Sequence, residues 1–362
     1  MSEWQETTLG ELITLQRGHD LAKTEMKEGR IPVAGSNGII GYHNKATTKA
    51  LGITIGRSGN IGNAYLYKND FWAHNTTLYV KDFKGNDEVF VYYLLKSIDF
   101  DGFNVGSAVP TLNRNHIHPM VIQKPDVNEQ KTIASVLSSL DDKIDLLHRQ
   151  NATLERMAET LFRQWFFEEA QEVWEEKPLS GIANFLNGLA CQKFPPTDAL
   201  NKLPVLKIKE LSSGISENSD WATSTVKPEY IIENGDVIFA WSASLMVKVW
   251  DGEKSVLNQH LFKVTSQKYP KWFYLQWCKY HLDEFIAISS SHATTMGHIK
   301  RGDLDGAIVK VPSSTELEEM SKILSPLLEK QITNSKQLKQ LVKLRDTLLP
   351  KLMSGEVRIT LN

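Results

Sequence analysis

Cysteine is scarce in this sequence, with Cys191 and Cys278 as the two cysteines among 362 residues. Two cysteines build no disulfide framework, and their spacing matches no metal-ligand motif, which excludes a disulfide-stapled secreted scaffold. Long apolar runs are also lacking, since none approaches the roughly 20 residues that span a bilayer. The N-terminal residues do not have the pattern of a signal peptide. We therefore expect a cytoplasmic protein with reduced thiols and no membrane partner.

An excess of charge of one sign is lacking as well. Lysine and arginine total 41 and aspartate and glutamate total 43, so the formal net charge is −2. A protein that binds nucleic acid on its own usually carries a basic surface. DNA binding by this chain would therefore need local basic patches or a partner subunit that supplies positive charge. The length itself favours two to three domains.

Signatures of catalysis are missing too. The stretch from Gly56 to Gly62 has glycines but lacks the lysine of a phosphate-binding loop, and no Gly-x-Ser-x-Gly elbow or metal-ligand cluster occurs. One pattern, Asp126 with Glu129 and Lys131, imitates the acidic pair and lysine of metal-dependent nucleases. Acidic residues are also favoured at a helix start, where backbone N–H groups are exposed. The sequence favours helix capping here, with a nuclease kept as an alternative.

One long amphipathic helix occurs twice. From Pro125 to Phe166 apolar residues recur with the 3.5-residue period of a helix that packs along another helix. A shift of 187 residues superposes Pro125 on Pro312 and Leu137 on Leu324 without a gap. We expect the two copies to pair along a seam formed by Leu140, Ile144, Leu147, Asn151, Leu154, Leu161, Leu327, Leu338, Leu341 and Leu348.

Start signals within each copy predict an interrupted helix. Asp126 and Ser313 are N-cap residues, each followed three residues later by glutamate as in a capping box. Ser325-Pro326 is a second start signal, because proline is favoured at the first helical position. We therefore expect short helices at about 127–137 and 314–324, a break, and long helices at about 140–166 and 327–349. Each long helix would measure roughly 40 Å at 1.5 Å per residue.

Polar residues on the seam allow two interpretations. Asn151 is either a tolerated polar residue or a buried contact that sets the register of the helix pair, a known role of asparagine in coiled coils. The second copy carries Gln331, Asn334 and Arg345 at seam positions. We expect this more polar seam to be partly solvated or to face a partner protein.

The blocks between the helices have the same sequence pattern. Short β-branched runs alternate with turn clusters rich in Gly, Ser and Asn, which is typical of a mixed, strand-rich domain. Trp4 aligns with Trp174 at a shift of 170, and Val80 aligns with Val264 at a shift of 184. The predicted fold class is α+β with an internal duplication. The expected divisions are 1–125 (first globular domain), 126–168 (first helical region), 169–312 (second globular domain) and 313–362 (second helical region and tail).

Loops of the two blocks carry the side-chain types that contact DNA. Asn, Gln, Arg and His read base edges in the major groove, although each loop taken singly is more typical of an ordinary hairpin turn. Arg114 and Arg301, aligned by the shift of 187, are the strongest candidates, for phosphate contact rather than base reading. The full candidate set is Ser36, Asn37, Arg57, Ser58, Asn60, His74, Asn75, Ser107, Thr111, Asn113, Arg114, Lys207, Lys209, Ser242, Ser244, Lys248, Asn258, Gln259, His292, Lys300 and Arg301.

Three segments of the sequence together form a specific combination: Trp4 with Leu9-Gly-Glu-Leu12, the stretch from Gly106 through Asn113-Arg114 to Leu140-Asp141, and the tail from Leu348 to Arg358. With these segments, and over essentially its whole length, the sequence resembles the specificity subunits of type I restriction-modification systems. The second block departs from the pattern, because its counterpart of the Gly-Ser to Asn-Arg segment runs from Ser291-His292 to Lys300-Arg301.

The resemblance implies a function in DNA recognition without catalysis. Each globular domain would be a target recognition domain that reads one half of a split sequence in double-stranded DNA. The two long helices would pair as an antiparallel coiled coil, act as a ruler between the half-sites and bind two methyltransferase subunits. S-adenosylmethionine and the adenine-N6-methylating site would belong to those subunits, so no cofactor is expected in this chain. Participation of a restriction (translocase) subunit stays open.

Two other functions remain as alternatives. One is the metal-dependent nuclease described above, and the other is a duplicated protein-interaction scaffold without DNA contact, which the near-neutral charge permits. A scaffold would show no steep dependence on salt in DNA binding.

Overall fold

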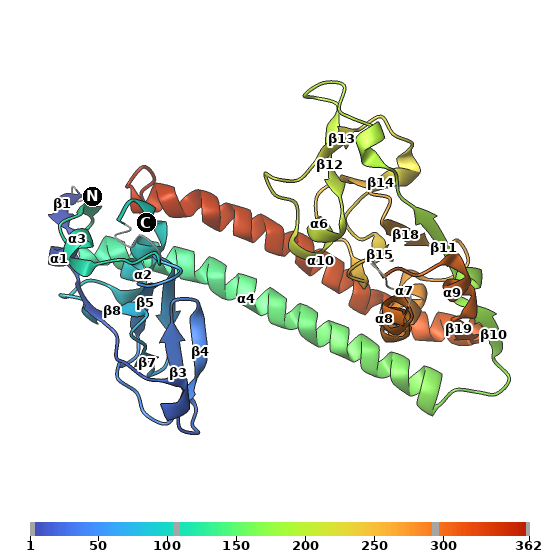
Figure 1. The fold of residues 1–362 in the computed structure, drawn as a ribbon, viewed down its shortest axis with the longest axis horizontal. Coiled ribbons are helices and arrows are strands. Elements are labelled where there is room, and N and C mark those ends of the chain that lie inside the picture. The colour runs from blue at the N-terminus through green and yellow to red at the C-terminus, as the bar shows by residue number, and fades with distance from the viewer. Residues whose placement is uncertain (1–3, 104–108, 292–296, 360–362) are drawn as a thin grey trace. The chain divides into compact units, whose positions relative to one another are not determined.

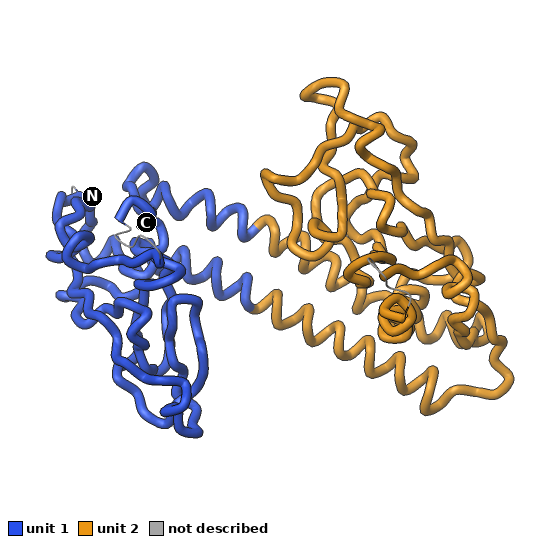
Figure 2. The backbone as a smooth tube through the Cα atoms, viewed as in Figure 1, with its two compact units in different colours: residues 1–145, 341–362 blue, residues 146–340 orange. Residues whose placement is uncertain are grey.

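The computed structural model describes residues 4–103, 109–291 and 297–359, and they divide into two units (Figures 1 and 2). Unit 1 comprises residues 1–145 and 341–362, and unit 2 comprises residues 146–340. Helix α4 (Val127–Arg163) and helix α10 (Ser314–Met353) each contribute residues to both units.

In unit 1 the strands form three sheets around two clusters of buried hydrophobic residues. The largest is an antiparallel sheet of order β2-β8-β5-β6, beside a sheet of order β4-β3-β7 and the pair β1-β9. The elements are β1 (Gln5–Thr8), α1 (Leu9–Leu12), β2 (Thr14–Arg17), β3 (Ile31–Gly35), β4 (Gly38–His43), β5 (Gly52–Gly56), β6 (Ala64–Tyr67), β7 (Trp72–Ala73), β8 (Thr77–Asp82), α2 (Glu88–Ser97), α3 (Arg114–Ile117) and β9 (Val121–Lys124), with 3-10 turns at Lys23–Glu25 and Asp101–Phe103.

Unit 2 repeats this arrangement with a larger second sheet. Its sheets have the orders β11-β18-β15-β16 and β13-β12-β17-β14, and β10 pairs with β19. The elements are β10 (Glu175–Pro178), α5 (Leu179–Ile182), β11 (Asn184–Asn187), β12 (Lys202–Leu206), α6 (Ile208–Ser213), β13 (Trp221–Thr223), β14 (Ile231–Ile232), β15 (Val237–Ala240), β16 (Met246–Val249), β17 (Ser255–Leu257), β18 (Leu261–Thr265), α7 (Lys271–Tyr280), α8 (Leu282–Ser291), α9 (Arg301–Gly306) and β19 (Ile308–Val311), with 3-10 turns at Cys191–Lys193 and Pro228–Tyr230.

The shared topology of the two units confirms the predicted α+β duplication. Each unit has a parallel strand pair inside its second sheet, β3 with β7 and β12 with β17. The central strands β5 and β15 are buried along their whole length. This burial on both faces explains why β15 appears in the sequence as a short apolar run, Val-Ile-Phe-Ala, rather than as an alternating pattern.

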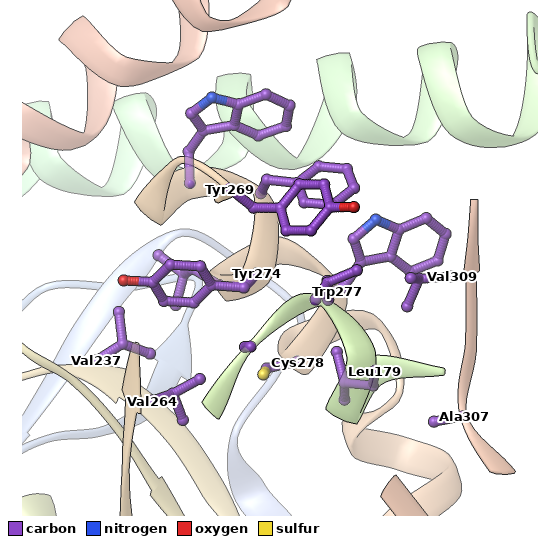
Figure 3. Close-up of a cluster of buried hydrophobic side chains, with 14 of the residues drawn as sticks. Leu179, Val237, Val264, Tyr269, Tyr274, Trp277, Cys278, Ala307 and Val309 are labelled. Carbon is purple, nitrogen blue, oxygen red and sulfur yellow. The ribbon is translucent and has the colours of Figure 1, made fainter. Parts of the chain in front are cut away.

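The core of unit 2 is rich in aromatic side chains. Trp272, Phe273 and Trp277 of α7 are buried against the central sheet and against the C-terminal part of α4. Figure 3 shows Tyr274, Trp277 and Cys278 among the apolar side chains of this cluster. Burial raises the pKa of the Cys278 thiol, which keeps it protonated and unreactive. Cys278 therefore acts as a small core residue.

The predicted caps are present at both long helices. The Asp126 carboxylate accepts hydrogen bonds from the backbone N–H groups of Asn128 and Glu129 at 2.9 and 3.0 Å. At the second helix, Ser313 and Glu316 form a reciprocal capping box, with Oγ accepting at 3.3 Å and the carboxylate accepting at 2.9 Å. Capping is therefore the structural role of Asp126, as the comparison of the two copies indicated.

The glutamates of the first helical turn bind a tryptophan from the start of each block. Trp4 Nε1 donates to the Glu129 carboxylate at 3.3 Å, and Trp174 Nε1 donates to the Glu316 carboxylate at 3.2 Å. The repeated tryptophan and the repeated glutamate thus meet in both units. Glu129 also forms an ion pair with Arg358, so both acids of the nuclease-like pattern have structural partners.

The predicted break in each long helix is wrong. Helix α4 continues through Ser138, and α10 continues through Ser325 and Pro326. Ser138 and Ser139 hydroxyls donate to the carbonyls three residues back instead of capping a new helix. Proline removes one backbone hydrogen bond from α10. Buried Leu324 and Leu328 on either side pack into the core of unit 2, so tertiary packing overrides this local signal.

Helix α4 ends in a π-helical turn, Gln164–Glu168, that the periodicity does not predict. The turn places Phe166 in the core of unit 2 while its neighbour Phe167 is 42% exposed. One extra residue in the turn rotates the following side chains. Here it directs Phe166 inward.

Within each unit the two long helices run antiparallel. In unit 1, Arg345 Nη1 donates to Asp141 Oδ1 at 2.9 Å. In unit 2, Asn151 lies opposite Gln331 and Ser335. The apolar residues of the predicted seam are buried at Ile144, Leu147 and Leu338 and half-buried at Leu140, Leu154, Leu161, Leu327, Leu341 and Leu348.

Asn151 is the centre of a polar network between the helices of unit 2. Its Oδ1 accepts from Asn334 Nδ2 at 2.9 Å, its Nδ2 donates to Ser335 Oγ at 3.1 Å, and its carbonyl accepts from Gln331 at 3.1 Å. Asn334 is completely buried, so the expectation that its seam position is solvated or faces a partner is wrong. The pairing of the half-buried Asn151 amide with the buried Asn334 amide favours the interpretation of Asn151 as a register-setting residue.

The ion pair of Arg358 with Glu129 predicts a pH-dependent contribution to stability. The hydrogen bond from Arg358 is the main cause that lowers the pKa of the Glu129 carboxyl; burial opposes it, and the hydrogen bond from Trp4 and the charge of Arg358 lower the pKa further. A carboxyl with a depressed pKa stabilises the fold above its unfolded pKa of about 4.3, and this contribution is lost as pH falls through the folded pKa. Arg358→Ala should therefore lower the unfolding temperature at pH 7.

The matched control is Gln171→Ala. Gln171 occupies the position equivalent to Arg358 and donates a neutral hydrogen bond to Glu316 at 2.9 Å. We expect Gln171→Ala to lower the unfolding temperature less than Arg358→Ala does, because a hydrogen bond from a charged donor is stronger than one from a neutral amide. The measurement is thermal unfolding of wild type and both variants from pH 7 to pH 3. If the unfolding temperature of Arg358→Ala stays below that of wild type by the same amount from pH 7 to pH 3, the stabilising ion pair with Glu129 is contradicted.

Among the described residues, no helix combines the length and the apolar character needed to cross a bilayer.

Candidate nucleic-acid interface

The predicted contact residues of unit 1 gather where several strands end. Backbone hydrogen bonds join the turn after β5 to two other segments: Arg57 N–H donates to Thr76 O at 2.8 Å, and Leu112 N–H donates to Arg57 O at 2.8 Å. Ser58 forms an isolated antiparallel bridge with Thr111. Three segments distant in the sequence therefore form one surface.

Polar side chains occupy this surface. Asn60 Nδ2 donates to Asn37 Oδ1 at 2.5 Å, which joins the β3–β4 turn carrying Ser36 to the Arg57 turn. Arg57 Nη1 donates to the carbonyl of Asn75 at 3.4 Å. Arg17, Arg57, Thr111, Asn113 and Arg114 line a hollow in the surface.

Several of these side chains also stabilise the loops. Asn113 Oδ1 caps α3 by accepting from Asn115 N–H at 3.0 Å, and Arg114 Nη1 donates to Leu15 O at 3.3 Å. His74 is held between the Thr76 hydroxyl and the Leu21 carbonyl. Arg114 is nevertheless exposed as a residue, which leaves it accessible to a ligand.

An acidic residue, Asp20, orders part of the surface. Hydrogen bonds from Asn75 and then from Arg17 lower the pKa of the Asp20 carboxyl. Arg17 donates to both carboxylate oxygens, at 3.2 and 2.7 Å. Asp20 therefore orients one amide and one guanidinium of the surface.

Unit 2 has the same backbone arrangement. Trp241, directly after β15, donates its N–H to His260 O at 3.4 Å and accepts at its carbonyl from Ile299 N–H at 3.0 Å. Ser242 forms a bridge with His298, as Ser58 does with Thr111. Arg301 Nη2 donates to Phe185 O at 3.4 Å, the counterpart of Arg114 with Leu15.

The predicted residues of unit 2 divide into two groups. Ser242, Ser244, Asn258, Gln259, Lys300 and Arg301 belong to the segments that this arrangement joins. Lys207 forms an ion pair with Asp220, and Lys209 is exposed on α6. Lys248 Nζ donates to Leu211 O at 3.2 Å and lines a cavity with Asn151 and Gln331 of the long helices. The contacts of Lys207 and Lys248 therefore lie on other segments than the Ser242 loop. Ser107 and His292 lie outside the described residues.

Sequence reasoning missed four side chains of these surfaces: Arg17 in unit 1, and Asn187, Trp241 and His298 in unit 2. The signal for Trp241 was available, because the shift of 184 that aligns Val80 with Val264 also aligns Arg57 with Trp241. Tryptophan is not among the residue types that commonly read base edges, so Trp241 was absent from the predicted set.

The surfaces carry side chains suited to binding a polar ligand. Each combines amides, hydroxyls and an arginine held by backbone carbonyls. In the described residues no group of three or more His, Cys, Asp or Glu side chains could hold a metal ion.

Comparisons with known proteins agree with this arrangement. The family model for the type I restriction modification DNA specificity domain matches residues 1–156 and 171–344. The MjaIX specificity subunit of Methanocaldococcus jannaschii is 28% identical over 301 residues, which cover 75% of this chain and 69% of that protein. The MjaVIII specificity subunit of the same organism is 22% identical over 99% of this chain and 93% of its own length.

A solved structure has the same fold. The crystal structure of the type I restriction-modification S subunit from M. genitalium aligns with a TM-score of 0.70 at 18% identity. The alignment covers 99% of this chain and 97% of that chain.

Proposed function

The chain belongs to the family of type I restriction modification DNA specificity domains, and we propose that it reads a split double-stranded DNA target with one half-site per unit. Members of this family recognise DNA sequence and are non-catalytic. The proposal concerns how this chain recognises DNA: unit 1 through the surface around Arg57 and Arg114, and unit 2 through the surface around Trp241 and Arg301.

One observation carries the proposal. The two units repeat a backbone arrangement of three joined segments, with an exposed arginine at the same place in each. The side chains around that arginine differ between the units. A shared scaffold with different side chains suits a protein that reads two different half-sites.

Partner subunits complete the proposed function. The chain would act in the cytoplasm with two methyltransferase subunits, which would bind the outer faces of α4 and α10 and carry S-adenosylmethionine for adenine-N6 methylation. A restriction subunit could join the same complex. The near-neutral charge of this chain supports the involvement of partner subunits, because DNA binding requires a positive surface and the partners would supply much of it.

We predict that Arg114→Ala and Arg301→Ala each weaken DNA binding by the assembled complex about tenfold, as expected for a lost charged hydrogen bond to phosphate. Each should also reduce the dependence of log K on log salt concentration by about 0.9. Binding of a target duplex, measured at several salt concentrations, tests both effects.

Arg114→Lys and Arg301→Lys are the matched controls. Lysine keeps the charge but cannot reproduce the planar guanidinium that reaches the carbonyls of Leu15 and Phe185. We expect these variants to keep most of the salt dependence. Wild-type binding that shows no steep salt dependence would favour the alternative of an interaction scaffold without DNA contact.

A further inference from the structure

The residue that follows the central strand differs in chemistry between the two units. Arg57 follows β5, and its backbone is hydrogen-bonded to Thr76 and Leu112. Trp241 follows β15, and its backbone is hydrogen-bonded to the equivalent residues His260 and Ile299. The backbone position is therefore equivalent, while a guanidinium in unit 1 is replaced by an indole in unit 2.

The residues around Trp241 are also more aromatic than those around Arg57. Its ring lies 5.6 Å from Phe262 in a stacked arrangement, 5.9 Å from His260 and 6.2 Å from His298, measured between ring centroids. The equivalent positions in unit 1 are Leu78, Thr76 and Thr111. Unit 2 thus presents a half-buried indole among aromatic rings where unit 1 presents a guanidinium beside two threonines, with a leucine beneath in place of Phe262.

The hydrogen bond of the indole limits what Trp241 can recognise. Its single donor, Nε1, binds Asn187 Oδ1 at 3.1 Å, so apolar atoms remain for further contacts. The base feature that apolar side chains contact in the major groove is the 5-methyl group of thymine. Arg57 uses Nη1 on the Asn75 carbonyl and has further N–H groups of the type that bind guanine.

We propose that Trp241 is a specificity-determining residue that packs against the methyl group of a thymine in the half-site read by unit 2. Arg57 is its counterpart and reads a guanine in the other half-site. This inference rests on the proposed function, because it assumes that these surfaces face DNA. It adds the chemical class of base that each unit selects at this position.

The test removes the methyl group from the DNA. After methylation mapping has defined the target, each thymine in both half-sites is replaced singly by deoxyuridine, and binding by the complex with methyltransferase subunits is measured. With wild type, one replacement should weaken binding about 4- to 10-fold, the effect of one buried methyl group. With Trp241→Ala, the same replacement should change binding less than twofold.

Two control variants separate recognition from folding. Trp241→Phe keeps an aromatic ring on Phe262 and should keep most of the sensitivity to deoxyuridine. Trp221→Ala removes another tryptophan of unit 2, 41% exposed on β13, and should leave the sensitivity unchanged. If Trp241→Ala does not fold, Trp241→Phe and Arg57→Ala still test the inference, the latter by relaxing selection at one guanine.

The outcomes separate this inference from the proposed function. Wild-type complex that binds all duplexes equally would overturn the proposed function itself. A selective complex that ignores every thymine methyl would overturn only the inference. Equal deoxyuridine sensitivity in wild type and Trp241→Ala would also overturn it.

Discussion

Inserting seven residues between Asp145 and Leu146, together with seven between Gln340 and Leu341, is expected to lengthen the unread gap of the DNA target by about three base pairs. Seven helical residues add about 10.5 Å, and base pairs are spaced about 3.4 Å apart. A heptad keeps the apolar seam in phase to within about 20°. The insertion points lie where the chain passes from one unit to the other, so contacts inside each unit are preserved.

Recognition of the original target should fall roughly hundredfold or more, since a displaced unit loses several base pairs at about 1–3 kcal/mol each. The measurement is methylation of a plasmid library in which the gap between the half-sites varies. This prediction rests on the proposed role of the helices as a ruler. A variant that still selects the original gap would contradict that role.

A seven-residue insertion in α4 alone is the matched control. It adds the same number of residues but leaves α10 unchanged, so the seam cannot close in register. The pairs Asn151–Asn334 and Asp141–Arg345 could then be kept only by looping out the insert. We expect loss of stability and of methylation on every gap length, rather than a shift to a longer gap.

Phe166→Ala should destabilise unit 2 by about 3–5 kcal/mol, the range for removing a large aromatic side chain from a core. Phe166 is fully buried, and its ring centroid lies 5.3 Å from that of Trp174, 5.4 Å from Trp277 and 5.7 Å from Phe273. The π-helical turn places it among these side chains, where its removal would leave a cavity. Denaturant unfolding followed by tryptophan fluorescence measures the effect.

Phe167→Ala is the control, because the same residue type follows in the same turn. Phe167 is 42% exposed and stacks on Tyr280 at 4.5 Å. Loss of this contact should cost about 1 kcal/mol. Similar destabilisation by the two substitutions would show that the turn itself, rather than the buried ring, determines stability.

Local signals predicted part of the structure well. The N-caps at Asp126 and Ser313 depend on hydrogen bonds within three residues, so the sequence contains all the information they require. The serine and proline signals at Ser138 and Pro326 were equally local, yet the helices continue through them. Packing of Leu324 and Leu328 against the core of unit 2 outweighs the lost backbone bond, and a local pattern does not contain that packing.

The candidate interface was predicted only in part for the same reason. Asn258, Gln259 and Ser242 belong to the joined loops of unit 2, whereas Lys248 binds Leu211 O and lies beside the long helices. All have residue types that contact DNA, so composition cannot distinguish them. Their positions depend on strand register, which places Lys248 opposite Ile238 in the sheet.

By itself the sequence determined the duplication, the α+β class, the long helices and their caps. Periodicity and caps depend on neighbouring residues, and the duplication follows from comparing the sequence with itself at a shift of 187 residues. Only the tertiary structure decided three other features: the continuity of both helices, the burial of Asn334 against Asn151, and the contacts of Trp241 with Asn187 and Ile299. All three depend on packing between segments that are distant in the chain, and the partners of Trp241 lie more than 50 residues away from it. The free energy of such contacts comes from burial and register, which form only when the chain folds.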